Sequence, residues 1–130
     1  MTGGRRFMIN ELNKMAKKHN IELKEGVCSL WEFVSTNDLK RIVKLNKNLL
    51  GNDDTPSIND VLHIKEEIYA DAFIRIVGDK ISCNIKGVYV PLNLKPEKFN
   101  KTVCLLGRYP NYIQKEIINS KEYLCLWWNY

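Results

Sequence analysis

The segment EYLCLWWNY, residues 122–130, most constrains the fold, because as a β-strand it would be apolar on both faces. Successive residues of a strand point to opposite faces. This alternation divides the side chains into two sets, with Tyr123, Cys125 and Trp127 on one face and Leu124, Leu126, Trp128 and Tyr130 on the other. Such a strand needs a covering layer on each side. We therefore predict that the segment is an integral strand of a sheet, with Cys125 among its most buried residues.

The tryptophans of this strand admit two interpretations. In the first, both fill the core. In the second, Trp128 and Tyr130 stay partly exposed and form an aromatic patch for a protein partner, because exposed apolar patches mark interfaces. Trp128 lies nearer the end of the segment than Trp127. We expect Trp128 to be the more exposed of the two.

Apolar residues recur at helical spacing through much of the first 72 residues. The pattern predicts helices over residues 6–19, 38–50 and 57–72, with a short strand at residues 21–24. Ser35 or Asn37 can cap the second helix, and Gly51 can end it. Ser57 can cap the third helix, where Asp60 completes a capping box.

The apolar period shortens to two after residue 72. A hairpin is expected to turn at Gly78-Asp79-Lys80. Further strands are predicted at residues 87–92 and 102–106, then a helix at residues 110–119, then the final strand. The predicted class is α+β, with three N-terminal helices followed by a β-hairpin or meander and a terminal β-α-β unit that form a small mixed sheet.

A winged-helix-like N-terminal part is the alternative fold, with the predicted hairpin as the wing. The third helix would then be the recognition helix. Its outer face is acidic, with Asp60, Glu67 and Asp71, and phosphates would repel it. The alternative therefore implies contact through another helix or with a protein.

The size and composition predict one α+β domain over residues 1–130, because 45% of the residues are hydrophobic. No apolar run approaches the roughly 18 residues of a membrane span, and MTGGRRFMIN lacks the apolar stretch of a secretory signal. The expected location is the cytoplasm, or the nucleus in a eukaryote. The four cysteines are widely spaced, so we expect free thiols without metal, with Cys83 and Cys104 buried in apolar alternations.

The positive charge is concentrated in one half of the chain. The net charge is +5, with ten basic and five acidic residues in positions 1–50 and ten of each in positions 51–130. Such asymmetry hints at an anionic partner. The candidate nucleic-acid-binding residues are Arg5, Arg6, Lys14, Lys17, Lys18, Lys40, Arg41, Lys44 and Lys47. A solvated helix face is the competing interpretation of the same residues.

Signals for catalysis are poor. The chain has no glycine-rich phosphate loop, no G-x-S-x-G and no H-E-x-x-H, and it has two histidines. Glu22-x-Lys24 resembles the end of a nuclease motif, but no Asp precedes it to hold a metal. We therefore expect no enzyme activity, no cofactor, no metal and no small-molecule substrate.

The resulting prediction is a small non-enzymatic intracellular binding protein. Its basic N-terminal half would associate with nucleic acid or with a nucleic-acid-handling complex. The alternative is a protein-interaction adaptor or inhibitor, of the kind that viruses and mobile elements encode. It would dock on a larger protein through its charged helices or its aromatic C-terminal strand. No membrane association is expected.

Overall fold

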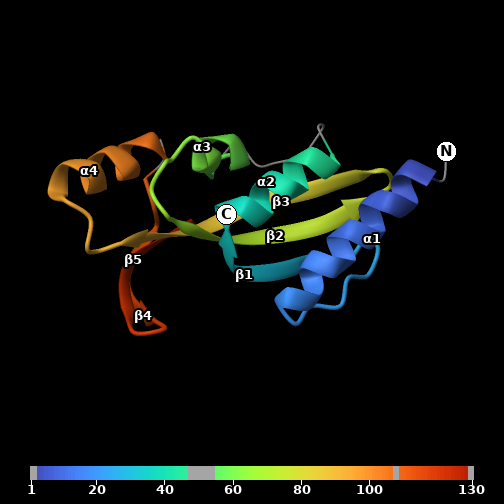
Figure 1. The fold of residues 1–130 in the computed structure, drawn as a ribbon, viewed down its shortest axis with the longest axis horizontal. Helices are drawn as coiled ribbons and strands as arrows, with labels where there is room; N and C mark the ends of the chain where they lie inside the picture. Colours follow the sequence, from blue (N-terminus) through green and yellow to red (C-terminus); the bar gives the residue numbers. More distant parts are fainter. Residues whose placement is uncertain (1–2, 47–54, 107–108, 129–130) are drawn as a thin grey trace.

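The computed structural model describes residues 3–46, 55–106 and 109–128 (Figure 1). Four helices and five strands lie in these ranges. In chain order they are α1 (Gly3–Lys18), β1 (Ser29–Ser35), α2 (Thr36–Leu45), α3 (Ile58–Leu62), β2 (Tyr69–Val77), β3 (Lys80–Pro91), α4 (Pro96–Leu105), β4 (Tyr112–Ile118) and β5 (Lys121–Trp127).

The strands form one antiparallel sheet in the order β1-β2-β3-β5-β4. Two hairpins supply four of them. The β2-β3 hairpin turns at Gly78, where φ is 63°, and the β4-β5 hairpin turns at Asn119 and Ser120, both with positive φ. Positive φ at both central residues gives a turn whose twist matches that of the flanking strands. The second hairpin joins the sheet through β5, which pairs with β3.

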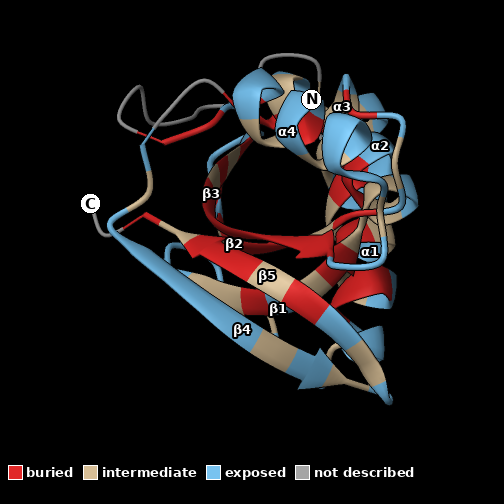
Figure 2. Cartoon of the chain, turned by 90° about the vertical axis from the view of Figure 1, so that its left-hand side faces the viewer, coloured by how far each residue is buried: buried red, intermediate tan, exposed pale blue. Residues whose placement is uncertain are grey.

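The helices cover one face of the curled sheet and build the core against it (Figure 2). Met8, Leu12 and Met15 of α1 lie four and three residues apart and are buried. From the sheet, the alternate residues of β2 and β3 point toward the helices, including Ile74 and Ile85. Burying these side chains supplies the main stabilisation of the fold.

The face of the sheet away from this core, which we call the open face, carries the other set of alternate residues. Two bulges shape it. The pairing register shifts in β1 between Trp31 and Val34, where Phe33 has a φ of 53°, and it shifts opposite Asp71 and Ala72 in β3. Bulges bend a strand and increase its local twist, so they contribute to the curl of the sheet.

The predicted arrangement of three N-terminal helices is wrong. Residues 57–72 form only the five-residue α3, and Tyr69 begins β2. The reason is that Ala70 and Ala72 alternate with Tyr69 and Asp71 of the open face and are buried as strand residues against the core, and Ile68 is buried just before the strand. The winged-helix alternative, which needed this third helix, is excluded with it. Residues 21–24, expected as a strand, have no regular structure, and β1 follows instead.

The predicted terminal β-α-β unit is also wrong. Residues 102–105 form the end of α4 and Leu106 is its C-cap. This helix starts with Pro96 at a first-turn position, where proline is favoured. Residues expected as a helix from Pro110 form β4. The sheet is consequently antiparallel throughout rather than mixed.

Several local predictions are confirmed. The side chain of Ser35 accepts a hydrogen bond from the Asp38 N–H at the start of α2, and Ser57 and Asp60 form the capping box of α3. The hairpin at Gly78 is present, and residues 121–127 form an integral strand. Gly51, expected to end the second helix, lies outside the described residues.

The burial of the C-terminal strand differs from the prediction in its aromatic residues. Cys125 is buried, but with 8% of its surface exposed it is less buried than Tyr123 and Leu126, so it is not among the most buried residues as expected. Trp128 is 0% exposed and belongs to the helix-side core. Trp127 is half-buried on the open face. The expected exposure of Trp128 is therefore wrong, and Tyr130 lies outside the described residues.

All four cysteines are free thiols. Cys83 is buried as predicted. Cys104 is exposed, contrary to the prediction, because it lies on α4 rather than on a strand. Within the described ranges, no helix is long and apolar enough to cross a bilayer.

Candidate functional site

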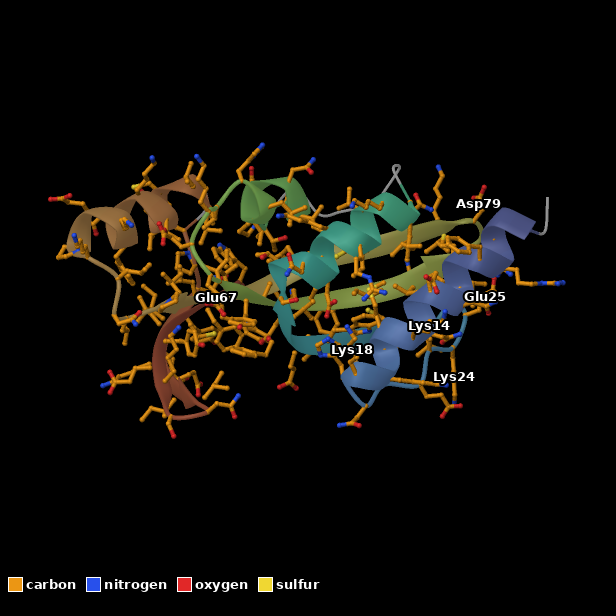
Figure 3. All side chains as sticks on the ribbon, in the orientation of Figure 1. Lys14, Lys18, Lys24, Glu25, Glu67 and Asp79 are labelled. Carbon is orange, nitrogen blue, oxygen red and sulfur yellow. The ribbon has the colours of Figure 1, made fainter. Side chains whose placement is uncertain are left out.

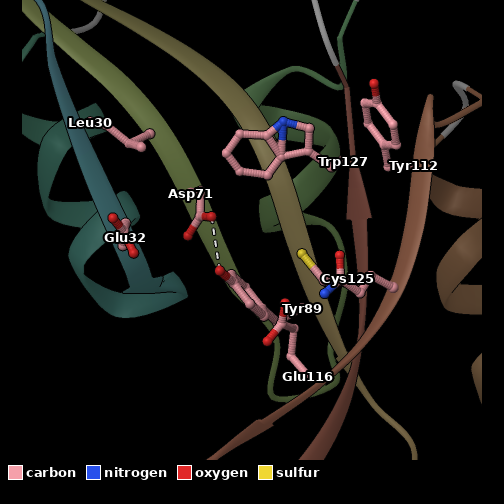
Figure 4. A pocket seen from close by; sticks show the side chains of 9 residues that line it. Leu30, Glu32, Asp71, Tyr89, Tyr112, Glu116, Cys125 and Trp127 are labelled. Atoms are coloured by element: carbon pink, nitrogen blue, oxygen red, sulfur yellow. Dashed lines mark hydrogen bonds between the residues drawn. The ribbon is translucent and has the colours of Figure 1, made fainter.

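A cavity of about 450 Å³ opens on the open face of the sheet (Figure 4). Its walls come from all five strands, including both edge strands, so the sheet curls around it. The residues that line it are Leu30, Glu32, Asp71, Tyr89, Tyr112, Gln114, Glu116, Cys125 and Trp127.

Strand register brings these side chains together from distant parts of the chain. One row crosses the sheet through Asp71, Gly87, Trp127 and Tyr112, each opposite the next. The adjacent row runs through Tyr69, Tyr89, Cys125 and Gln114. Residues directly opposite in neighbouring strands have side chains in contact range. The cavity is thus built mainly from these two neighbouring rows, with Glu116 from the next row and Leu30 and Glu32 from β1.

Asp71 is the most buried acid in the cavity, with 3% of its surface exposed. Its Oδ1 accepts a hydrogen bond of 2.9 Å from the Phe33 N–H, and its Oδ2 accepts one of 2.8 Å from the Tyr89 hydroxyl. The first bond satisfies a backbone group that the β1 bulge removes from the ladder. Asp71 therefore ties β1 to β2 and β3 while its carboxylate borders the cavity.

Burial raises the pKa of the Asp71 carboxyl above its ordinary value of 3.8. The two hydrogen bonds act in the opposite direction because they favour the carboxylate. The neighbouring Glu32 and Glu116 raise the pKa further, because like charges disfavour ionisation. The three acids therefore interact electrically across the cavity.

Gly87 lets the Trp127 indole lie close to the sheet. A Cβ atom at Gly87 would sit 2.9 Å from Trp127 Cε3 and 3.6 Å from Asp71 Oδ2. The first distance is too short for any real side chain, so glycine makes room for the ring here. The indole and the carboxylate consequently converge over this position.

An aromatic cluster supports the cavity on its Tyr89 side. Phe33 stacks on Tyr69 with ring centroids 3.9 Å apart, and it meets Tyr89 and Tyr123 edge to face. Such pairs add to the stabilisation that burial provides. The Tyr69 hydroxyl donates to Glu67 at 2.8 Å, and this hydrogen bond raises the pKa of Tyr69 to about 12. The cluster holds Tyr89 in position for its bond to Asp71.

The described members of the predicted basic set lie on α1 and α2, away from the lining of the cavity. Lys14 and Lys18 project from α1 (Figure 3) and pair with Glu11 at 2.9 Å and Asp38 at 3.5 Å. Arg41 also approaches Asp38, at 3.7 Å, and Arg5 pairs with Glu25. The remaining described members of the set are all exposed: Arg6, Lys17, Lys40 and Lys44. Lys47 lies outside the described residues.

The structure thus brings Lys18 and Arg41 together around one acid, Asp38. A smaller groove of about 220 Å³ lies between the two helices. Its lining residues are Phe7, Glu11, Met15, Arg41, Lys44 and Leu45.

Comparison with known proteins adds no family to this geometry. No protein-family model matches the chain, and neither do curated proteins or solved structures. The candidate site is therefore assigned from its own residues.

Sequence reasoning missed the cavity, because its residues are scattered over five strands. One available signal was Asp71, an acid between Ala70 and Ala72 in a segment whose alternate residues are apolar. An acid in such a segment points away from the main core and needs partners of its own.

Proposed function

We propose that this chain is a binding protein whose ligand occupies the cavity of the open face. The observation that carries the proposal is a cavity of about 450 Å³ to which every strand contributes. Small-molecule sites have volumes of roughly 300–1,000 Å³ and combine apolar and aromatic walls with a few convergent polar groups. The apolar and aromatic walls here are Trp127, Tyr112 and Leu30. The polar groups are the three acids and Gln114.

Binding is a better proposal than catalysis because the reactive groups of the cavity are poorly activated. Burial, with help from nearby Asp71 and Glu116, raises the pKa of the Cys125 thiol to about 12. A thiol with this pKa is almost wholly protonated at neutral pH and is a weak nucleophile. Burial and Asp71 also raise the pKa of Tyr89, and no histidine lines the cavity.

The proposal is tested by nuclear magnetic resonance with a fragment set that contains neutral, anionic and cationic compounds. We expect at least one fragment to shift the backbone amide signals of residues on the open face, including those next to Trp127, Cys125 and Gln114. The amides of Lys98 and Lys101 on α4 should remain unshifted, because neither residue lines the cavity. Shifts confined to surfaces outside the open face, or no shifts at all, would show that the cavity is not a binding site.

The exposed cations of α2 favour a second candidate function, contact with nucleic acid. Lys40, Arg41 and Lys44 are exposed on consecutive turns of this helix. Cations that meet phosphates release counterions, so binding of this kind weakens steeply with added salt. Asp38 partly neutralises the positive charge of Arg41, so Arg41 would attract a phosphate less strongly. For this reason nucleic-acid binding is the second candidate.

The second candidate makes its own prediction. Lys40→Glu with Lys44→Glu should weaken binding to mixed-sequence nucleic acid at low salt by at least about tenfold, as measured by fluorescence anisotropy. The control is Lys98→Glu with Lys101→Glu, which changes the net charge equally on exposed positions of α4. Equal losses in both variants would indicate a general charge effect, and no binding by the unaltered protein would remove this candidate.

A further inference from the structure

The charge of the cavity is opposite to that of the chain. The net charge of the protein is +5. All charged residues that line the cavity are nevertheless acidic, namely Glu32, Asp71 and Glu116. These acids repel one another, since both glutamates raise the pKa of Asp71. The cavity therefore favours a positively charged ligand, which would relieve this repulsion.

The three carboxylates are too widely spaced for a metal centre. Within the described residues, no group of three acids, histidines or cysteines is close enough to hold a metal ion. A ligand that meets all three carboxylates has to be larger than a metal ion. The cavity volume of about 450 Å³ provides this room.

Aromatic rings flank the acids. Trp127 and Tyr112 face each other across the β4-β5 pair, and Trp127 converges with Asp71 over Gly87. Aromatic ring faces attract organic cations, and they also bury apolar parts of a ligand. Two of the Asp71 oxygen positions already accept hydrogen bonds, but a carboxylate has about four such positions and can accept more.

We propose that the cavity binds a small organic cation. Its ammonium or guanidinium group would meet Asp71 and Glu32, and its apolar body would lie against Trp127 and Tyr112. The inference rests on the proposed function, since it names the ligand class of the same site. A volume of about 450 Å³ lies within the range of small-molecule sites, whereas an extended protein segment would need a longer groove.

The test compares three probes that share one aromatic body and differ in charge: benzylammonium, benzyl alcohol and benzoate. We expect benzylammonium to bind about tenfold more tightly than benzyl alcohol, and benzoate not to bind. Affinities are measured by titration with the amide signals of the open face as the readout.

Two glutamine substitutions test whether the acids of the cavity select a cation. Glu32→Gln with Glu116→Gln should weaken benzylammonium binding by about tenfold, and the fold should survive because Glu32 is exposed and Glu116 is only half-buried. The matched control is Glu122→Gln on β5. Glu122 pairs with Lys115 at 3.3 Å, and it does not line the cavity, so its removal should leave binding unchanged.

The outcomes separate this inference from the function on which it rests. If benzyl alcohol or benzoate binds the cavity as tightly as benzylammonium, the cavity remains a binding site but the cation assignment is wrong. If the double glutamine variant binds benzylammonium normally, the acids do not select the ligand. If a lysine-rich peptide, added as a fourth probe, binds the open face and benzylammonium does not, the ligand is a protein segment and not a small molecule. If no fragment of any charge binds, the proposed function itself fails.

Discussion

Replacing Trp128 with alanine is expected to lower the free energy of unfolding by about 3–5 kcal/mol. Trp128 is completely buried in the helix-side core, and the change leaves a large cavity that its neighbours fill only partly. A loss of this size is comparable with the whole stability of a small domain, about 5–15 kcal/mol. Denaturant unfolding followed by circular dichroism measures it.

The adjacent tryptophan provides the control. Trp127→Ala should cost much less, about 1–2 kcal/mol, because Trp127 is only half-buried on the open face. Trp128→Phe should also be milder than Trp128→Ala, since it keeps most of the apolar area and removes an indole N–H that is buried without a hydrogen-bond partner among the described residues. Equal losses for Trp127→Ala and Trp128→Ala would contradict the assignment of these residues to different faces.

The second large effect is expected at Asp71. Asp71→Ala should destabilise the protein by about 2–4 kcal/mol, because the Phe33 N–H and the Tyr89 hydroxyl both lose their acceptor. Asp71→Asn should be far milder. The amide oxygen can still accept from Phe33, and the amide N–H₂ can donate to the Tyr89 oxygen. Chemical denaturation of both variants at neutral pH distinguishes them.

The pH dependence of these variants follows from the raised pKa of Asp71. When the pKa of an acid is higher in the folded state, its ionised form opposes folding. This cost is fully present above the folded-state pKa, and it disappears as the pH falls toward the unfolded value near 3.8. The stability of the wild-type protein relative to Asp71→Asn should therefore rise as the pH is lowered through this window. A relative stability that falls instead would mean that the hydrogen bonds outweigh burial.

Local signals in the sequence predicted local structure well. Ser35, Ser57 and Asp60 mark helix starts because a cap uses only neighbouring backbone groups. The turn at Gly78 depends on a glycine that readily adopts positive φ. The apolar alternation around Cys125 likewise predicted an integral strand. The helices cover only one of its faces, and on the open face Tyr123 and Cys125 pack with aromatic residues of the curled sheet.

The errors in secondary structure arose where strand pairing in the folded protein decides between helical and strand periodicity. Ile58, Val61 and Ile68 fit a helical stripe, yet Ile68 leads into β2 because β1 and β3 are available to pair with that segment. In β4, Ile113 and Ile117 are exposed, so this edge strand lacks the burial pattern that would identify it.

The sequence of the C-terminal strand could not predict which of its two tryptophans, Trp127 or Trp128, is buried in the main core. Trp127 and Trp128 occupy opposite faces in any strand, and only the packing of the helices determines which face becomes the core. The cavity was hidden for a similar reason. Its acids reach one another through the register of five strands, and none of them has an acidic neighbour in the sequence that would mark a site.

The position of β5 between β3 and β4 separates the order of synthesis from the order of the sheet. A ribosome delivers β1, β2 and β3 first, and these strands can already pair with one another. The outer edge of β3, at Gly87–Pro91, then stays unpaired until the chain has been translated through β5. At about 5–20 residues per second this interval lasts roughly a few seconds. During that time the nascent chain presents an unpaired apolar edge, the kind of surface that chaperones shield and that otherwise joins a neighbouring chain.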